Sequence, residues 1–132
     1  MEKGGTNLLL LLSAITVMFF SFSCKAKPTE TPVLETKISG KVVAYSSDTE
    51  PCSQVIRMAE KADYLFHESS GLLHGHSSAM QAGDIANQAG VKVLYLIHYP
   101  TGEHPIDQLT SEAKQRFNGP VYLAEDFLSL DF

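Results

Sequence analysis

The sequence has little cysteine and no cluster of basic residues. Only 2 of its 132 residues are cysteines, Cys24 and Cys52, so no internal disulfide can form if Cys24 serves another purpose. The formal net charge is −5, and lysine and arginine gather nowhere into a patch. Such a chain lacks the electrostatic attraction that provides most nonspecific affinity for nucleic acid. We therefore expect no nucleic-acid partner.

Residues 1–24 have the pattern of a targeting segment. The apolar runs Leu8–Leu12 and Ala14–Phe20 are together too short to span a bilayer comfortably. Cys24 follows a small residue, which resembles the end of a bacterial lipoprotein signal, although Ser21 stands where an aliphatic residue is usual. We expect an exported protein of the cell envelope, anchored in a membrane by acylation of Cys24. The alternatives are an ordinary cleaved signal peptide and an uncleaved anchor.

The remaining chain divides into a linker and one small domain. Residues 25–39 contain prolines and threonines and little to bury, which predicts a flexible tether. Residues 40–132 are near the lower size limit for an independent core.

Cys52 follows Pro51 near a predicted helix start, and no histidine lies within a few residues to act as its base. This favours a buried structural cysteine over a nucleophile.

Strand and helix patterns alternate through the domain. Runs rich in β-forming residues predict strands at 41–46, 63–67, 92–97 and 121–124, with 127–130 as a further strand beside the last. Apolar or small residues at helical spacing predict helices at 51–62, 77–89 (capped by Ser77 or Ser78 and ended by Gly90) and 105–117. This alternation is typical of an α/β layer architecture.

Acidic and imidazole side chains follow the predicted strands where each one ends. Asp48, Glu68 and His98 come after the first, second and third strands, and His76 lies in the loop after the second. In open α/β sheets, ligands bind beyond the carboxyl ends of the strands, so these residues are expected to converge. Carboxylate and imidazole groups together are the ligands that a zinc site uses.

Each of these residues also has a purely structural interpretation. Asp48 could cap the first helix, and His98 could be a hydrogen-bonded histidine of the core. The triplet His74-Gly75-His76 could form only a turn. Spacing alone does not decide between these interpretations and a metal site.

Several segments match those of a known family, in its order and spacing, over about 90 residues. They are residues 43–52 (with Ser47 where the family usually has glycine), 62–69, 75–78 with 81–82, 89–92, 96–98 and 123–126. From about Gly40 onward the sequence thus resembles the C-terminal half of the metallo-β-lactamase-fold hydrolases, most nearly the short ribonuclease Z-like branch.

The resemblance implies a role for each candidate residue. Asp48 corresponds to a carboxylate that bridges two metal ions, usually zinc, and His98 to a ligand of the second ion. His76 corresponds to a histidine that contacts the scissile phosphate and helps to protonate the leaving group. Glu68 would orient the imidazole ring of His76. In that chemistry, water activated by the metals attacks a phosphodiester or ester.

The sequence also departs from the family. It contains no His-x-His-x-Asp-His motif, which the family carries in its N-terminal half, and the serines after His76 prevent the His74-Gly75-His76 triplet from replacing it. We expect half of an αββα sandwich, a mixed sheet with helices on one face, and therefore a homodimer or a partner that supplies the other half. Tight metal binding then requires His76 or a second chain. The alternatives are a non-catalytic lipoprotein binding module and a remnant of a longer enzyme.

Overall fold

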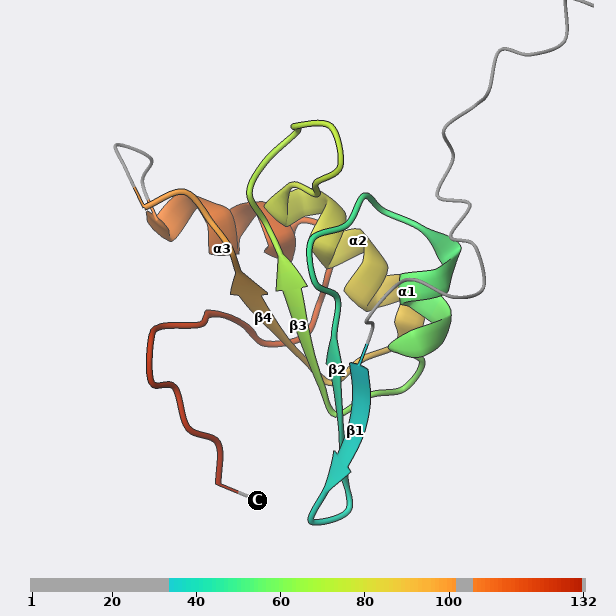
Figure 1. Ribbon diagram of the computed structural model, residues 1–132. Coiled ribbons are helices and arrows are strands. Elements are labelled where there is room, and N and C mark those ends of the chain that lie inside the picture. Colours follow the sequence, from blue (N-terminus) through green and yellow to red (C-terminus); the bar gives the residue numbers. More distant parts are fainter. Residues whose placement is uncertain (1–33, 102–105, 132) are drawn as a thin grey trace, which may run out of the picture.

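The computed structural model describes residues 34–101 and 106–131 (Figure 1). The predicted signal segment 1–24 with Cys24, and the tether up to residue 33, lie outside these residues. Within the described ranges, no helix is both long enough and apolar enough to cross a bilayer.

A mixed sheet with strand order β1-β2-β3-β4-β5 forms the centre of the domain. Its strands are Leu34–Ile38, Lys41–Tyr45, Tyr64–Glu68, Val93–Ile97 and Val121–Leu123. The strand β1 is antiparallel to β2, and all other neighbouring strands are parallel. The connecting helices α1, α2 and α3, which lie together on one face of the sheet in Figure 1, are Ser53–Met58, Ala79–Ala89 and Ile106–Lys114. The predicted α/β class, with a mixed sheet and helices on one face, is confirmed.

The strand β1 lies in the range that the sequence predicted as a tether. It forms a hairpin with β2 through Ser39 and Gly40, whose φ angles of 50° and 79° are both left-handed. Two such residues make the turn whose twist matches paired strands. A serine-glycine pair between two β-rich runs was therefore the signal for this strand. The structure places Leu34–Ile38 in the sheet.

Two other elements differ from the sequence prediction. Residues 127–130 form no strand, because the Leu128 amide donates to the Glu125 carbonyl at 3.1 Å and Phe127 adopts a left-handed φ of 65°. This turn carries the chain away from β5. The first helix is also shorter than the predicted 51–62, since it begins at Ser53 and ends at Met58.

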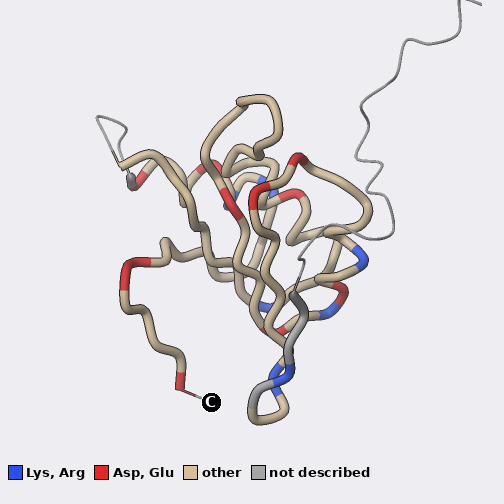
Figure 2. Tube along the Cα trace, in the orientation of Figure 1, with Lys and Arg blue, Asp and Glu red and all other residues tan. Residues whose placement is uncertain are grey.

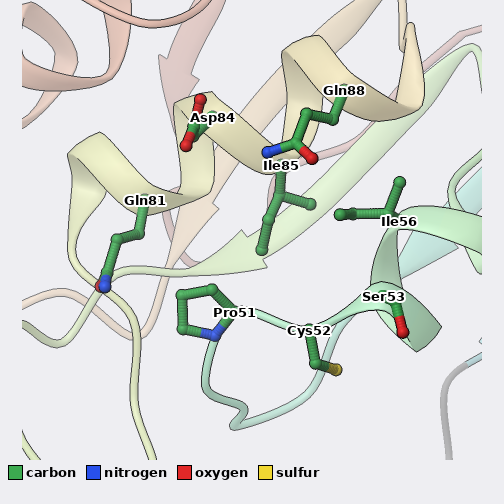
Figure 3. A pocket seen from close by; sticks show the side chains of 8 residues that line it. All are labelled: Pro51, Cys52, Ser53, Ile56, Gln81, Asp84, Ile85 and Gln88. Atoms are coloured by element: carbon green, nitrogen blue, oxygen red, sulfur yellow. The ribbon is translucent and has the colours of Figure 1, made fainter. Parts of the chain in front are cut away.

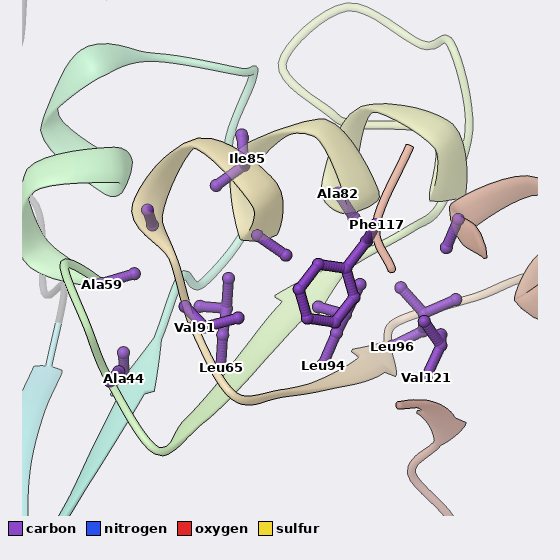
Figure 4. Packing of buried hydrophobic residues seen from close by; sticks show 14 of the residues in the cluster. Ala44, Ala59, Leu65, Ala82, Ile85, Val91, Leu94, Leu96, Phe117 and Val121 are labelled. Carbon is purple, nitrogen blue, oxygen red and sulfur yellow. The ribbon is translucent and has the colours of Figure 1, made fainter. Parts of the chain in front are cut away.

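The core lies between the sheet and the helices (Figure 4). Ala44, Leu65, Leu94 and Val121 are aligned in one row across β2 to β5, and all are buried. Above them, α2 packs tightly against α3, because a Cβ atom added at Gly83 would lie 2.3 Å from the Ala113 carbonyl oxygen. The absence of a side chain at Gly83 thus allows α2 and α3 to pack closely.

The ends of α2 are defined by side-chain and backbone caps. The Ser78 hydroxyl accepts from the Gln81 amide, and the Gln81 side chain accepts from the Ser78 amide, which forms a capping box. Gly90 ends the helix in a left-handed conformation with φ 66°. The start of α2 is therefore fixed just after the loop that carries His76.

Candidate metal centre at the strand ends

Three of the predicted site residues converge beyond the carboxyl ends of the parallel strands. Asp48, His76 and His98 follow β2, β3 and β4, and one potential ligand atom from each lies within 4.8 Å of the other two. His98 Nδ1 lies 2.8 Å from Asp48 Oδ1, and both side chains are about half exposed. The structure therefore brings together segments that are up to 50 residues apart in sequence.

Backbone turns place Asp48 and His98 at this edge. The register aligns Tyr45, Phe66 and Tyr95, so that β2, β3 and β4 end near the same level. Ser47 and His98 then adopt left-handed φ angles of 54° and 47°. Such a conformation favours glycine, which is the residue that the resemblance leads one to expect at the position of Ser47.

Glu68 lies beneath this group and is fully buried. Its Oε1 accepts hydrogen bonds from the amides of Thr49 (3.1 Å) and Ser77 (2.9 Å), and its Oε2 accepts from the amide and hydroxyl of Ser70. Burial would raise the pKa of Glu68, but the hydrogen bonds from Ser70, Thr49 and Ser77 outweigh it and lower this pKa. Glu68 is therefore ionised at neutral pH and joins the loops after β2 and β3.

The same carboxylate orients His76. His76 Nδ1 lies 3.2 Å from Glu68 Oε1, and an ionised carboxylate can only accept, so Nδ1 carries a proton. The other ring nitrogen, Nε2, is then the one that can bind a cation or exchange a proton with a substrate. The rings of His76 and His98 meet edge to face, with their centroids 5.5 Å apart. Glu68 thus has the geometry of a positioning residue for His76.

The donor set of this group fits a divalent cation. Two imidazoles and one carboxylate are three protein ligands, the number that a catalytic zinc site uses, and a carboxylate behind a ligating histidine is a common support. Within residues 34–101 and 106–131, no other cluster of three or more such groups forms. These three ligands suffice for one ion, whereas the second ion of the family site would need ligands from outside this group.

Other residues near the centre differ from the sequence analysis. His74 is exposed and is not part of the group, although it belongs to the same triplet as His76. Thr49 and Ser70 were missed as supports of Glu68, because Thr49 donates through its backbone amide and Ser70 through its amide and hydroxyl, and no sequence motif marks these contacts.

Cys52 is half-buried rather than buried. It packs against the core and lines a pocket of about 350 Å³ between α1 and α2, with Ile56 and Ile85 (Figure 3). No histidine is among the residues that line this pocket. The thiol therefore lacks an imidazole base there, in agreement with the structural interpretation.

Comparison with known proteins supports the resemblance noted in the sequence. The chain is 36% identical over 108 residues to ribonuclease Z of Archaeoglobus fulgidus, covering 75% of this chain and 35% of that protein. It is 37% identical over 108 residues to ribonuclease Z of Methanothermobacter thermautotrophicus, covering 75% and 34%. The structure matches the metallo-β-lactamase-fold protein YhfI of Bacillus subtilis with a TM-score of 0.61 and 29% identity, covering 70% of this chain and 45% of that chain. The described domain has a metallo-β-lactamase fold.

The similarity extends over only part of each known protein. The chain spans about a third of the length of the curated ribonucleases Z that it matches. A diphosphatase of the PhnP family, 24% identical with a TM-score of 0.51 over 68% of this chain and 35% of that chain, supports the fold alone. No protein-family model matches the chain.

Proposed function

We propose that the chain contributes part of the active site of a metal-dependent hydrolase of the metallo-β-lactamase superfamily. Its substrate is a small phosphodiester or ester. The observation that carries this proposal is the convergence of Asp48, His76 and His98 from three separate strand ends. Ligands of zinc type at the carboxyl edge of an α/β sheet are arranged for hydrolysis.

Each residue has a distinct role in the proposed site. Asp48 and His98 hold the cation, most readily zinc, with His76 close enough to serve as a third ligand. A bound cation supplies Lewis-acid stabilisation of negative charge and makes water more acidic. With substrate bound, His76 leaves the cation and is protonated on both ring nitrogens: Glu68 holds the proton on Nδ1, and the proton on Nε2 passes to the leaving oxygen.

We also propose that a partner covers the open face of the sheet, either another copy or a different chain, and that only a different chain supplies the missing metal ligands. The sequence contains no His-x-His-x-Asp-His motif to supply the other ligands of the family. The sheet face opposite the helices carries Tyr45, Phe66, Tyr95 and Tyr122 in one row, and Tyr45 and Tyr122 are exposed. A contiguous aromatic surface of this kind is typical of a protein interface.

Anchoring by Cys24 and a small substrate remain part of the proposal. Acidic residues lie around the ends of β2 and β3, whereas Lys37 and Lys41 lie at the opposite end in the β1–β2 hairpin (Figure 2). This distribution does not favour a polyanion at the site. Replacing Cys24 by alanine is expected to abolish labelling of the protein with radioactive palmitate in cells, and unchanged labelling would contradict the lipid anchor.

Zinc binding by the purified chain tests the metal centre. We expect Asp48→Asn and His98→Gln to weaken zinc binding by at least about 10-fold to 100-fold, because each removes a ligand and the loss of even a supporting group has an effect of this size. His74→Gln is the matched control, since His74 lies beside His76 but outside the group. If the two site variants bind zinc as well as the control does, the metal centre is wrong.

Hydrolysis of bis(4-nitrophenyl) phosphate tests the reaction. Activity should disappear with a chelator, return with zinc, and increase when a polypeptide with the His-x-His-x-Asp-His segment is added. Zinc binding without hydrolysis under any of these conditions would instead favour a non-catalytic binding module.

A further inference from the structure

Two large apolar side chains stand exposed beside the candidate metal centre. Leu72 and Leu73 follow each other in the loop after β3, and they are 82% and 66% exposed. An exposed apolar patch with polar residues around it is typical of a ligand-binding groove.

The loop holds these leucines in place. The Gly71 amide donates to the Ser77 carbonyl at 3.0 Å and closes the base of the loop. The His76 amide donates to the Leu73 carbonyl at 3.1 Å, and the Gly75 amide donates to Glu50 Oε1 at 2.9 Å. Leu72 and Leu73 are therefore presented on a loop anchored to the same segment that carries His76.

The leucines line a hollow that adjoins the candidate metal centre at His76. This hollow has a volume of about 560 Å³, and its lining residues are Glu50, Pro51, Leu72, Leu73, His74, His76 and Gln81. His76 belongs both to the hollow and to the metal-ligand group. The carboxylate of Glu50 disfavours a negatively charged occupant next to the leucines.

We infer that the substrate carries an uncharged apolar group, aryl or alkyl, on its leaving oxygen, and that this group packs against Leu72 and Leu73. The inference rests on the proposed function, because it uses His76 as the proton donor to that oxygen. In the reaction, the water oxygen forms a bond to the phosphorus or acyl carbon, and the bond to the leaving oxygen breaks. The leaving oxygen takes the proton of His76 and departs as an apolar alcohol or phenol. One proton of the attacking water restores His76.

Phosphonate binding tests the inference on the zinc-loaded chain. Phenylphosphonate and methylphosphonate share the anionic group, so their difference in affinity reports the apolar contact. We expect phenylphosphonate to bind about tenfold more tightly, since burying a ring contributes an affinity of this order. The double variant Leu72→Asn with Leu73→Asn should bring the ratio close to one and leave methylphosphonate binding unchanged. Leu128→Asn, at an exposed leucine outside the hollow, should keep the wild-type ratio.

A second measurement separates this inference from the proposed function. Benzyl alcohol needs no metal, and its titration should shift the NMR methyl signals of Leu72 and Leu73 more than those of Leu128. Selective shifts without phosphonate binding would support the apolar binding surface and contradict the proposed hydrolytic centre. Absence of selective shifts, or a phenyl-to-methyl ratio that the double variant does not change, would overturn the apolar surface itself.

Discussion

The two faces of the sheet differ in how they are covered. On one face, Leu65, Leu94 and Leu96 are fully buried beneath the helices. On the other, Tyr45 and Tyr122 are 43% and 51% exposed at the two ends of an aromatic row. The same strands build both faces, because successive side chains of a strand point to opposite sides. The helix-covered face therefore stabilises the domain, whereas the aromatic face is available for a partner.

Aromatic contacts organise the uncovered face. The rings of Phe66 and Tyr95 stack with their centroids 4.9 Å apart, and Tyr122 lies 5.4 Å from Tyr95. Side chains pack against one another on both faces, but only the helix-covered face is buried from water. The candidate metal centre lies beyond the ends of the same strands that build the aromatic face. A partner bound to this face would therefore lie next to the metal centre.

The largest effect is expected from truncating the helix-covered face. Leu65→Ala should lower the free energy of unfolding by about 2–5 kcal/mol, because it removes buried methyl groups and leaves a cavity. Tyr122→Ala, on the other face, should lower it by less than about 1 kcal/mol, since this side chain is half exposed. Urea unfolding of both variants measures the difference. Equal losses would show that the two faces contribute alike.

A smaller effect is expected at the end of β3. Glu68→Gln replaces one acceptor oxygen by an NH₂ group, which cannot accept from the amides that Glu68 now holds. The free energy of unfolding should fall by about 1–3 kcal/mol. Hydrogen exchange should also become faster at the amides of Thr49, Ser70 and Ser77. Glu125→Gln, at an exposed glutamate, is the control, and equal exchange in both variants would contradict this role of Glu68.

Regular patterns allowed the sequence to predict much of this arrangement. The helix α2 begins after Ser78 and stops at Gly90, as their capping chemistry indicated. Asp48 and His98 lie together because parallel strands end at one edge, a rule that needs no side-chain detail. Their roles as ligands remain a prediction.

Features that depend on local backbone geometry were not predicted. The strand β1 was missed because Ser39-Gly40 signals a hairpin only when both of its flanking segments are recognised as strands. Glu68 accepts hydrogen bonds from backbone amides of two loops, and every residue type except proline has such an amide, so the sequence cannot indicate which ones are used. The prediction of a strand at 127–130 was wrong, because a turn precedes these apolar residues and they pair with no neighbouring strand.

Acid should weaken the helix-covered face through His67. This side chain is fully buried, and burial lowers its pKa below the ordinary value of 6.5. Below about pH 6.5 the unfolded chain binds a proton that the folded chain does not, so stability falls as the pH falls, by at most about 1.4 kcal/mol per pH unit. Unfolding between pH 5 and 7 should show this slope in the wild type and a shallower one in His67→Asn. An identical slope in both proteins would assign the acid sensitivity to other groups.

The smallest change in stability, and the most direct test of the aromatic face, is expected from its exposed ends. The double variant Tyr45→Ser with Tyr122→Ser should change the free energy of unfolding by less than about 1 kcal/mol, because neither ring is buried. It should nevertheless weaken self-association by about tenfold, as expected when exposed aromatic anchors of an interface are removed. Sedimentation over a range of concentrations measures this, with Leu128→Ser as the control. If the control weakens association and the tyrosine variant does not, the contact surface lies elsewhere and the aromatic face has no partner in a second copy.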